Sequence, residues 1–250
     1  MAALCLTSWA LSPRLWSDET SGDIENFNRN LGLEGIGSDL ANVEQELSHT
    51  AEPKSTGITP GGTETAKKSG IRPKPSSAHL AFSNLSFRSD PQVSNVVRNY
   101  VQSQLARGNL SNLPSYDVLL HRFDRRFAAY GFSSHNLGDT VAGYLIISWE
   151  VLHNADASQT PNGIRRVRDA VCEILERRGK AAHQPDATKQ KISELFKSVG
   201  EILSEKATLM RQANNPAAEQ QILNSIERIG LQLGLDLRRL QLTDQGFVNG

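Results

Sequence analysis

The sequence predicts an all-α fold, a bundle or irregular array of about six helices that follows a disordered N-terminal arm. Three observations lead to this prediction. From about residue 89 onward, apolar residues recur at spacings of three and four, the period of a helix with one buried face. Proline, glycine and asparagine interrupt this pattern at short intervals, as expected where helices begin and end. Before residue 89, large apolar residues are too sparse to form a core.

The chain of 250 residues therefore divides into an arm, residues 1–88, and a helical domain, residues 89–250. Residues 50–77 of the arm are rich in Thr, Ser, Pro, Gly and Lys, a composition that predicts a disordered linker. Residues 79–88 alternate apolar and polar side chains. That alternation is compatible with a short strand or with an extended segment docked on the domain.

The first twelve residues, 1–12, resemble the apolar centre of a secretory signal but have no basic segment before it. A truncated start would explain this pattern and would place the protein in the periplasm or outside the cell. A chain that begins at Met1 would instead be cytoplasmic. The sequence leaves both locations open.

Three helices are predicted in the first half of the domain. The first begins at Pro91, since proline suits a first turn, and ends at Gly108. The second runs from about Ser115 to Gly131 and has an aromatic apolar face. The third spans residues 136–153 and is apolar on nearly every side, with several small residues. A helix of this kind belongs in the middle of a bundle, so we predict that the third is the central helix.

Three further helices are predicted in the second half of the domain. The fourth follows Pro161, and the fifth runs from Pro185 to a stop at Asn214. The sixth carries an apolar stripe over residues 222–233 and is followed by a glycine suited to a helix end. Leucines alternate with other residues over 231–237, so a strand there is the alternative.

Charge, hydropathy and cysteine content exclude several classes of protein. The net charge is zero, with a balance of −6 in residues 1–50 and +6 in the remainder, which is far from the concentrated positive charge of a dedicated nucleic-acid binder. No run of about 18 apolar residues predicts a membrane-spanning helix. The two cysteines, Cys5 and Cys172, are too few for a disulfide framework. Cys172 borders an apolar stripe and is expected to be a small buried side chain.

Glu150 and His153 are the candidate metal ligands. Residues three apart share a helix face, and a Glu-x-x-His pair supplies ligands in di-iron helix bundles. Such a site needs a second Glu-x-x-His and two further carboxylates, and the sequence holds no second copy. Helix-end and surface contacts are the simpler interpretation. Asp139, in the first turn of the same helix, is explained by its favourable position at the positive end of the helix dipole.

Two groups of arginines are candidate anion-binding residues, one on the polar face of the second helix and one at the start of the fourth. They are Arg122, Arg125 and Arg126, and Arg165, Arg166 and Arg168. Solvated faces with nearby acidic partners are the default interpretation. The alternative is a site for an anionic ligand, a nucleic acid or a lipid head group.

Several short motifs carry a family resemblance. They are Tyr130-Gly131-Phe132, the stretch from Asn136 to Ala142, Trp149, Lys189-Gln190 and the closing Leu242–Phe247. Through these motifs the C-terminal two-thirds of the chain resembles a bacterial family of helical domains that has no assigned activity and usually follows a signal peptide. The resemblance implies an all-helical fold and export, and it supplies no catalytic residues. The chain departs from the pattern in lacking a complete signal peptide.

The sequence does not define a biochemical activity. It contains no phosphate-binding loop, dinucleotide fingerprint, nucleophile elbow or zinc-ligand spacing. The leading hypothesis is a non-enzymatic helical interaction or structural domain that has no cofactor and contacts a protein partner. The first alternative is a helical metal-binding protein or enzyme that uses Glu150 and His153. The second is an anion-binding module that uses the two arginine groups.

Overall fold

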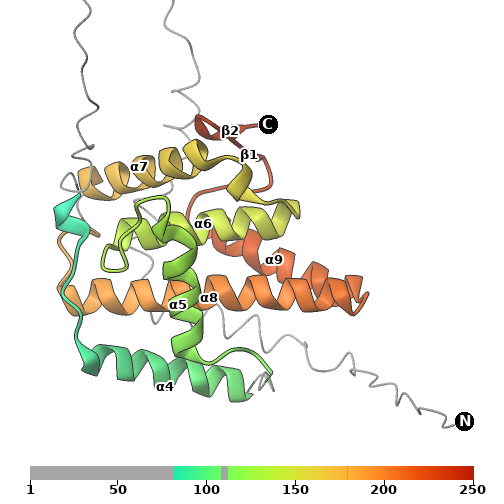
Figure 1. The fold of residues 1–250 in the computed structure, drawn as a ribbon, viewed down its shortest axis with the longest axis horizontal. Helices are drawn as coiled ribbons and strands as arrows, with labels where there is room; N and C mark the ends of the chain where they lie inside the picture. Colours follow the sequence, from blue (N-terminus) through green and yellow to red (C-terminus); the bar gives the residue numbers. More distant parts are fainter. Residues whose placement is uncertain (1–81, 108–111, 179) are drawn as a thin grey trace, which may run out of the picture.

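The computed structural model describes residues 82–107, 112–178 and 180–250. These residues form six α-helices, two short 3-10 helices and one β-hairpin (Figure 1). The helices are α4 (Pro91–Arg107), α5 (Tyr116–Ala128), α6 (Leu137–His153), α7 (Pro161–Arg178), α8 (Asp186–Gln212) and α9 (Pro216–Gln232), with η3 (Ser83–Leu85), η4 (Ala157–Gln159), β1 (Leu240–Thr243) and β2 (Gly246–Asn249). The predicted all-α fold of six helices is confirmed. The predicted signal segment and linker lie outside the described residues.

Helix α6 lies in the middle of the molecule, as predicted. It packs against α7, α8 and α9, and α5 runs across it from the side of α4 (Figure 1). Every residue from Leu137 to Trp149 is buried. Asn136 begins the helix by accepting a hydrogen bond from the Asp139 amide, and Asn154 ends it in the left-handed conformation, with φ of 47°. An all-round apolar helix therefore occupies the position in which it exposes least surface to water.

Helix α5 approaches α6 at Gly143. The rings of Phe123 and Phe127 occupy the space that a Cβ atom at residue 143 would need. Glycine at this position lets two aromatic side chains pack directly on the α6 backbone, so even a methyl group would push α5 outward. The small residues of α6 thus have the packing role that the sequence predicted.

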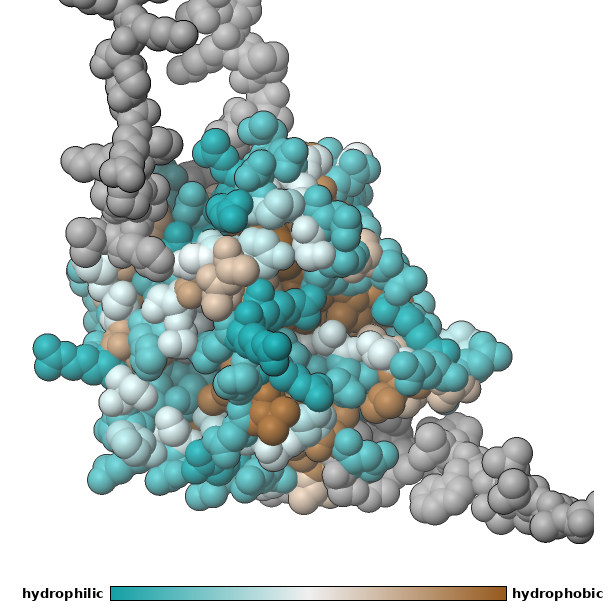
Figure 2. Space-filling model, viewed as in Figure 1, coloured by the Kyte–Doolittle hydropathy of each residue, from teal (hydrophilic) through white to brown (hydrophobic). Residues whose placement is uncertain are grey.

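The surface of the described residues is mainly polar. Figure 2 shows one face, on which hydrophobic side chains appear in small, separate groups among hydrophilic ones. In the described ranges, three large apolar side chains are exposed to solvent. They are Val96 of α4, Val118 of α5 and Leu231 of α9. None of the helices in the described ranges combines the length and apolar character needed to span a lipid bilayer.

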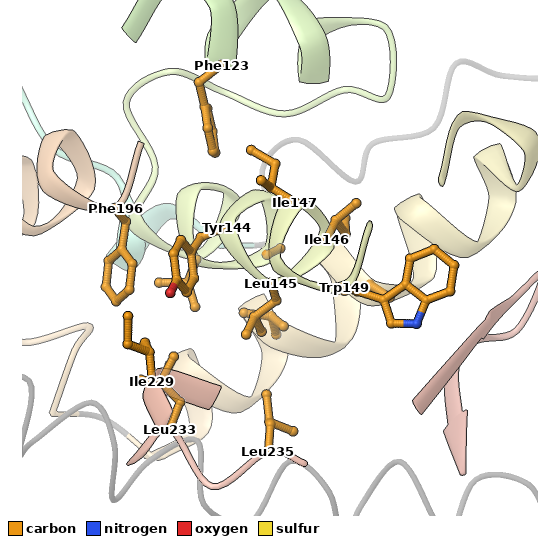
Figure 3. Close-up of a cluster of buried hydrophobic side chains, with 14 of the residues drawn as sticks. Phe123, Tyr144, Leu145, Ile146, Ile147, Trp149, Phe196, Ile229, Leu233 and Leu235 are labelled. Carbon is orange, nitrogen blue, oxygen red and sulfur yellow. The ribbon is translucent and has the colours of Figure 1, made fainter. Parts of the chain in front are cut away.

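The apolar core surrounds α6 and extends along one side of α8. Figure 3 shows Tyr144 of α6 beside Phe196 of α8, with Ile229 and Leu233 close to them. The rings of Tyr144 and Phe196 are tilted, with centroids 4.8 Å apart. Trp149 packs at the far end of α6, where its indole contacts the ring of Phe247 from β2. The core thus joins α6, α8, α9 and the C-terminal hairpin into one unit.

The N-terminal segment, residues 82–90, lies against the helices. After the turn η3, Ser86 pairs with Asn136 in an isolated antiparallel bridge, and the Phe87 amide donates to the carbonyl of His135. Leu85 is fully buried. Of the two conformations expected for this region, the structure shows a docked segment that is extended after a short 3-10 turn. The boundary between arm and domain at residue 88 stays a prediction.

The chain ends in a hairpin of β1 and β2, which the sequence did not predict. The alternating leucines from 231 onward do not form a strand. Helix α9 continues to residue 232, Gly234 reverses the chain with φ of 78°, and Leu233, Leu235 and Leu237 are all buried. The antiparallel strands follow, with Leu240 opposite Asn249. Burial of three successive alternate leucines against one core explains the pattern without a strand.

Candidate functional site

Three aromatic rings near the end of α5 each face an arginine. The arginine Cζ lies 5.7 Å from the ring centre for Arg126 and Phe127, 5.9 Å for Arg165 and Tyr130, and 5.8 Å for Arg168 and Phe132. These distances are typical of cation–π contacts. Arginines from both predicted groups therefore converge on residues 127–132, although the groups are far apart in the sequence.

Arg168 forms a buried ion pair with Asp139. Its Nε donates to Asp139 Oδ1 at 2.6 Å, and the side chains are only 9% and 1% exposed. Asp139 Oδ2 also accepts from the Ser133 amide at 2.6 Å. One carboxylate thus joins the start of α6, the middle of α7 and the loop before α6. Removing one partner of such a pair leaves an uncompensated buried charge, so the contact is important for the fold.

Cys172 belongs to the same buried cluster. Its Sγ lies 3.5 Å from Asp139 Oδ1, and it is fully buried, as predicted. Burial, followed by the neighbouring Asp139, raises the pKa of the Cys172 thiol well above its ordinary value. The thiol therefore stays protonated at neutral pH and is poorly suited to act as a nucleophile. Cys5 lies outside the described residues.

Glu150, one of the two candidate metal ligands, is engaged by protein groups on both oxygens. Its Oε2 pairs with Arg126 of α5, and its Oε1 accepts from the Ala157 amide at 2.9 Å. Burial raises the pKa of the Glu150 carboxyl, while Arg126 opposes this shift. The sequence placed Glu150 and Arg126 in two different hypotheses, and the structure places them in one contact.

His153 is engaged in a different direction. Its Nε2 lies 3.0 Å from the carbonyl oxygen of Leu237, to which it donates, and its ring stacks on Trp149 with centroids 4.9 Å apart. Among the residues that the structure describes, no group of three or more His, Cys, Asp or Glu side chains is arranged to hold a metal ion. A metal role for Glu150 and His153 stays a prediction.

The remaining candidate arginines lie at the surface. Arg122 pairs with Glu205 of α8 at 2.9 Å. Arg125, Arg165 and Arg166 are exposed and form no ion pair with any described residue. Arg165 also faces Tyr130 and donates to Asn162. An anion-binding role for these arginines stays a prediction.

A row of buried polar residues on α8 was missed by the sequence analysis. Gln190, Glu194, Lys197 and Glu201 follow one another at spacings of four, three and four, so they lie on one stripe of the helix. Each is at least nine-tenths buried. We call this row, together with its partners on α4 and α5, the polar seam. The spacing was a readable signal, but burial of the stripe depended on α4 and α5 covering it.

The partners of the polar seam come from the start of α4 and from α5. Gln190 exchanges two hydrogen bonds with the backbone of Asp90, at 2.7 and 2.9 Å. Glu194 accepts from Ser94 Oγ and from the hydroxyl of Tyr116, each at 2.7 Å. The first half of the seam thus fixes the start of both helices on α8.

The second half of the polar seam is charged. Lys197 Nζ donates to Asp124 of α5 at 2.6 Å and to the carbonyl of Ser134 at 2.8 Å. Glu201 follows one turn later, and the charges that act most strongly on it are Arg126 and Arg122 of α5. Burial raises the pKa of the Glu201 carboxyl, and these two arginines lower it. The seam therefore ends at the Arg126–Glu150 pair described above.

These features define an all-helical domain whose buried polar side chains join its helices. The chain belongs to the family of unknown function DUF6683, whose sequence profile matches residues 55–249. The family resemblance predicted from the short motifs is confirmed by this match. Comparison with curated proteins gave no match, and neither did comparison with solved structures. The bacterial origin and the signal peptide stay predictions.

Proposed function

We propose that the chain is a non-catalytic helical domain with a structural or protein-binding role. One observation carries this proposal. Glu150 and His153, the two side chains for which the sequence suggests metal or catalytic chemistry, are committed to contacts that fasten segments of the chain to α6. A reactive group needs polar atoms that are accessible and not already bonded. Polar atoms of these two side chains are instead hydrogen-bonded within the protein.

The Glu-x-x-His pair at the end of α6 fits this interpretation. Glu150 binds the amide of Ala157 and so fixes η4, the turn that leads into α7. His153 binds the carbonyl of Leu237, in the turn before the hairpin. The neighbouring Trp149 indole Nε1 donates to the carbonyl of Leu240 at 2.9 Å. Three neighbouring side chains of one helix end therefore anchor η4, which follows α6 directly, and residues 237–240, which follow much later in the sequence.

The residues that carry the family resemblance act in the same way at the N-terminal segment. Lys189 Nζ donates to the carbonyl of Asn84 at 2.5 Å, and Gln190 pairs with the backbone of Asp90. The side chain of Asn136 donates to the carbonyl of Phe82 at 3.1 Å. In this chain these residues therefore serve to fasten the N-terminal segment to the helices, which supports a role that depends on shape and surface.

The experiment that tests the proposal compares Glu150→Ala with Glu173→Ala, a control at an exposed glutamate of α7. We expect no stoichiometric iron, manganese or zinc in the purified full chain, measured by elemental mass spectrometry. Glu150→Ala should lower the free energy of unfolding by about 1–3 kcal/mol, because Arg126 and the Ala157 amide lose their acceptor. Glu173→Ala should change it by less than about 0.5 kcal/mol.

A different result would contradict the proposal. The metal-binding alternative would be established if the wild-type protein and Glu173→Ala both contained stoichiometric metal and Glu150→Ala contained none. Turnover of a substrate that Glu150→Ala abolishes without unfolding the protein would establish an enzyme.

A further inference from the structure

Three carboxylates and two guanidinium groups meet where α5 lies over α6 and α8. They are Glu150, Glu201 and Glu205, and Arg122 and Arg126. Two of the three glutamates have an arginine partner. Arg126 pairs with Glu150, and Arg122 pairs with Glu205. Glu201 is the carboxylate that remains, and it has no ion pair with any residue in the described part of the chain.

Glu201 is also the most enclosed of the three. It is 8% exposed, and its Oε1 is a buried oxygen without a hydrogen-bond partner among the described residues. Lys197, one turn earlier on α8, is bound to Asp124 and Ser134. An ionised carboxylate in such a position loses most of its hydration, and its Oε1 gains no donor in return, which makes the charged form costly.

A proton bound to the Glu201 carboxylate removes its charge, and with it the cost of burying that charge, and it needs no additional space. We propose that Glu201 takes up a proton when the solution is acidified and that the protonated form holds α5 more tightly against α8. The polar seam then responds to pH at its charged end. Acidification strengthens the attachment of α5, and a rise in pH weakens it.

The direction of the effect follows from the pKa of the Glu201 carboxyl. Burial raises this pKa in the folded state, while Arg126 and Arg122 lower it and Glu205 and Glu150 raise it slightly further. The net shift is upward from the ordinary value of 4.5. The stabilising contribution is therefore complete below the unfolded-state pKa, and it is lost as the pH rises through the folded-state pKa.

The test compares the full wild-type chain with Glu201→Gln in urea unfolding at several values between about pH 5 and about pH 7.5. Glutamine has the shape of the protonated side chain and cannot ionise. We expect the variant to have the higher urea midpoint at about pH 7.5, and we expect the difference to shrink towards about pH 5. Glu150, whose carboxyl pKa is also raised by burial, is present in both proteins, so the effect of its own burial cancels and only its weak coupling to Glu201 differs between them.

Glu173→Gln on α7 is the matched control, because Glu173 is an exposed glutamate that pairs with Arg177 on its own helix. Its difference from wild type should not vary with pH. A Glu201→Gln midpoint equal to or below that of wild type at about pH 7.5, or a difference that is constant with pH, would overturn the proposal.

Hydrogen exchange decides whether the effect acts on α5. In wild type, protection factors of α5 amides should fall between about pH 5 and about pH 7.5 by more than those of α9, and Glu201→Gln should remove this excess fall. An equal change in α5 and α9 would contradict a local effect and would show that Glu201 acts on global stability only.

Discussion

Helix α8 has two different sides. The side that faces α6 is apolar, and its Phe196 and Gly200 pack against Tyr144 and Ile147. The side that faces α4 and α5 carries the polar seam. Apolar burial on the first side is non-directional and proportional to area. The hydrogen bonds and ion pairs of the second side have fixed geometry, and each contributes little net stability, although leaving one group unpaired is costly. The first side thus contributes most of the stability, and the second determines how α4 and α5 are positioned.

This difference predicts that α4 and α5 form the least stable unit of the helical domain. Units attached by few apolar contacts open at a lower free energy than the global unfolding reaction. Val97 and Val101 of α4 and Phe123 of α5 are buried in the core cluster, so the unit is not held by the polar seam alone. Hydrogen exchange of the wild-type chain should nevertheless show that the amides of α4 and α5 are less protected than those of α6.

The largest expected effect breaks the apolar side. Phe196→Ala should lower the free energy of unfolding by about 3–5 kcal/mol, because Phe196 is 3% exposed and its removal leaves a cavity beside Tyr144. Urea unfolding followed by circular dichroism measures this change. Protection should fall in α6 and α9 as well as in α4 and α5. A cost below 1 kcal/mol would show that the site collapses and that this side is not the principal support.

A smaller effect is expected from the polar side. Tyr116→Phe removes the hydroxyl that donates to Glu194 Oε2 and should cost about 1.5–3 kcal/mol, since a buried charged acceptor loses its donor. Here the informative readout is local. Exchange should accelerate in α4 and α5 and remain unchanged in α9. Uniform acceleration across all helices would mean that the polar seam does not open separately.

The smallest effect concerns the exposed edge of the polar seam. Arg122→Gln removes a pair whose side chains are 47% and 36% exposed, so it should change the free energy of unfolding by less than about 1 kcal/mol. Arg122 also lowers the pKa of Glu201. The variant should therefore shift the pH dependence of the urea midpoint towards higher pH. A shift towards lower pH would show that Glu201 does not cause the pH dependence of the urea midpoint.

The helices and the burial of α6 could be predicted from the sequence because both depend on local spacing. The side-chain pairs could not, because they depend on the relative positions of the helices. Arg168 is an instructive intermediate case. It lies four residues after Ile164 and four before Cys172, both fully or almost fully buried, so its position on the apolar stripe was visible. Its partner, Asp139, was explained by the helix dipole alone and became apparent only in the structure.

The C-terminal hairpin was missed for a related reason. Two four-residue strands give a weak periodic signal, and the turn depends on Gly246, whose φ is 99°. The hairpin also needs Gly163 of α7, because a Cβ atom there would overlap the carbonyl of Thr243. Such a contact between backbone and backbone leaves no apolar pattern in either segment.

The attachment of both ends of the described part of the chain to α7 has a mechanical consequence. The N-terminal segment is fastened near one end of the helix, where Asn84 donates to Glu176, and the hairpin is fastened near the other, at Gly163 (Figure 1). A force that pulls the two ends of the described chain apart therefore acts partly along the axis of α7 and partly through α6 and α8, which also hold these segments. It shears the contacts at both ends at once, whereas a force applied to one end alone would peel them in sequence.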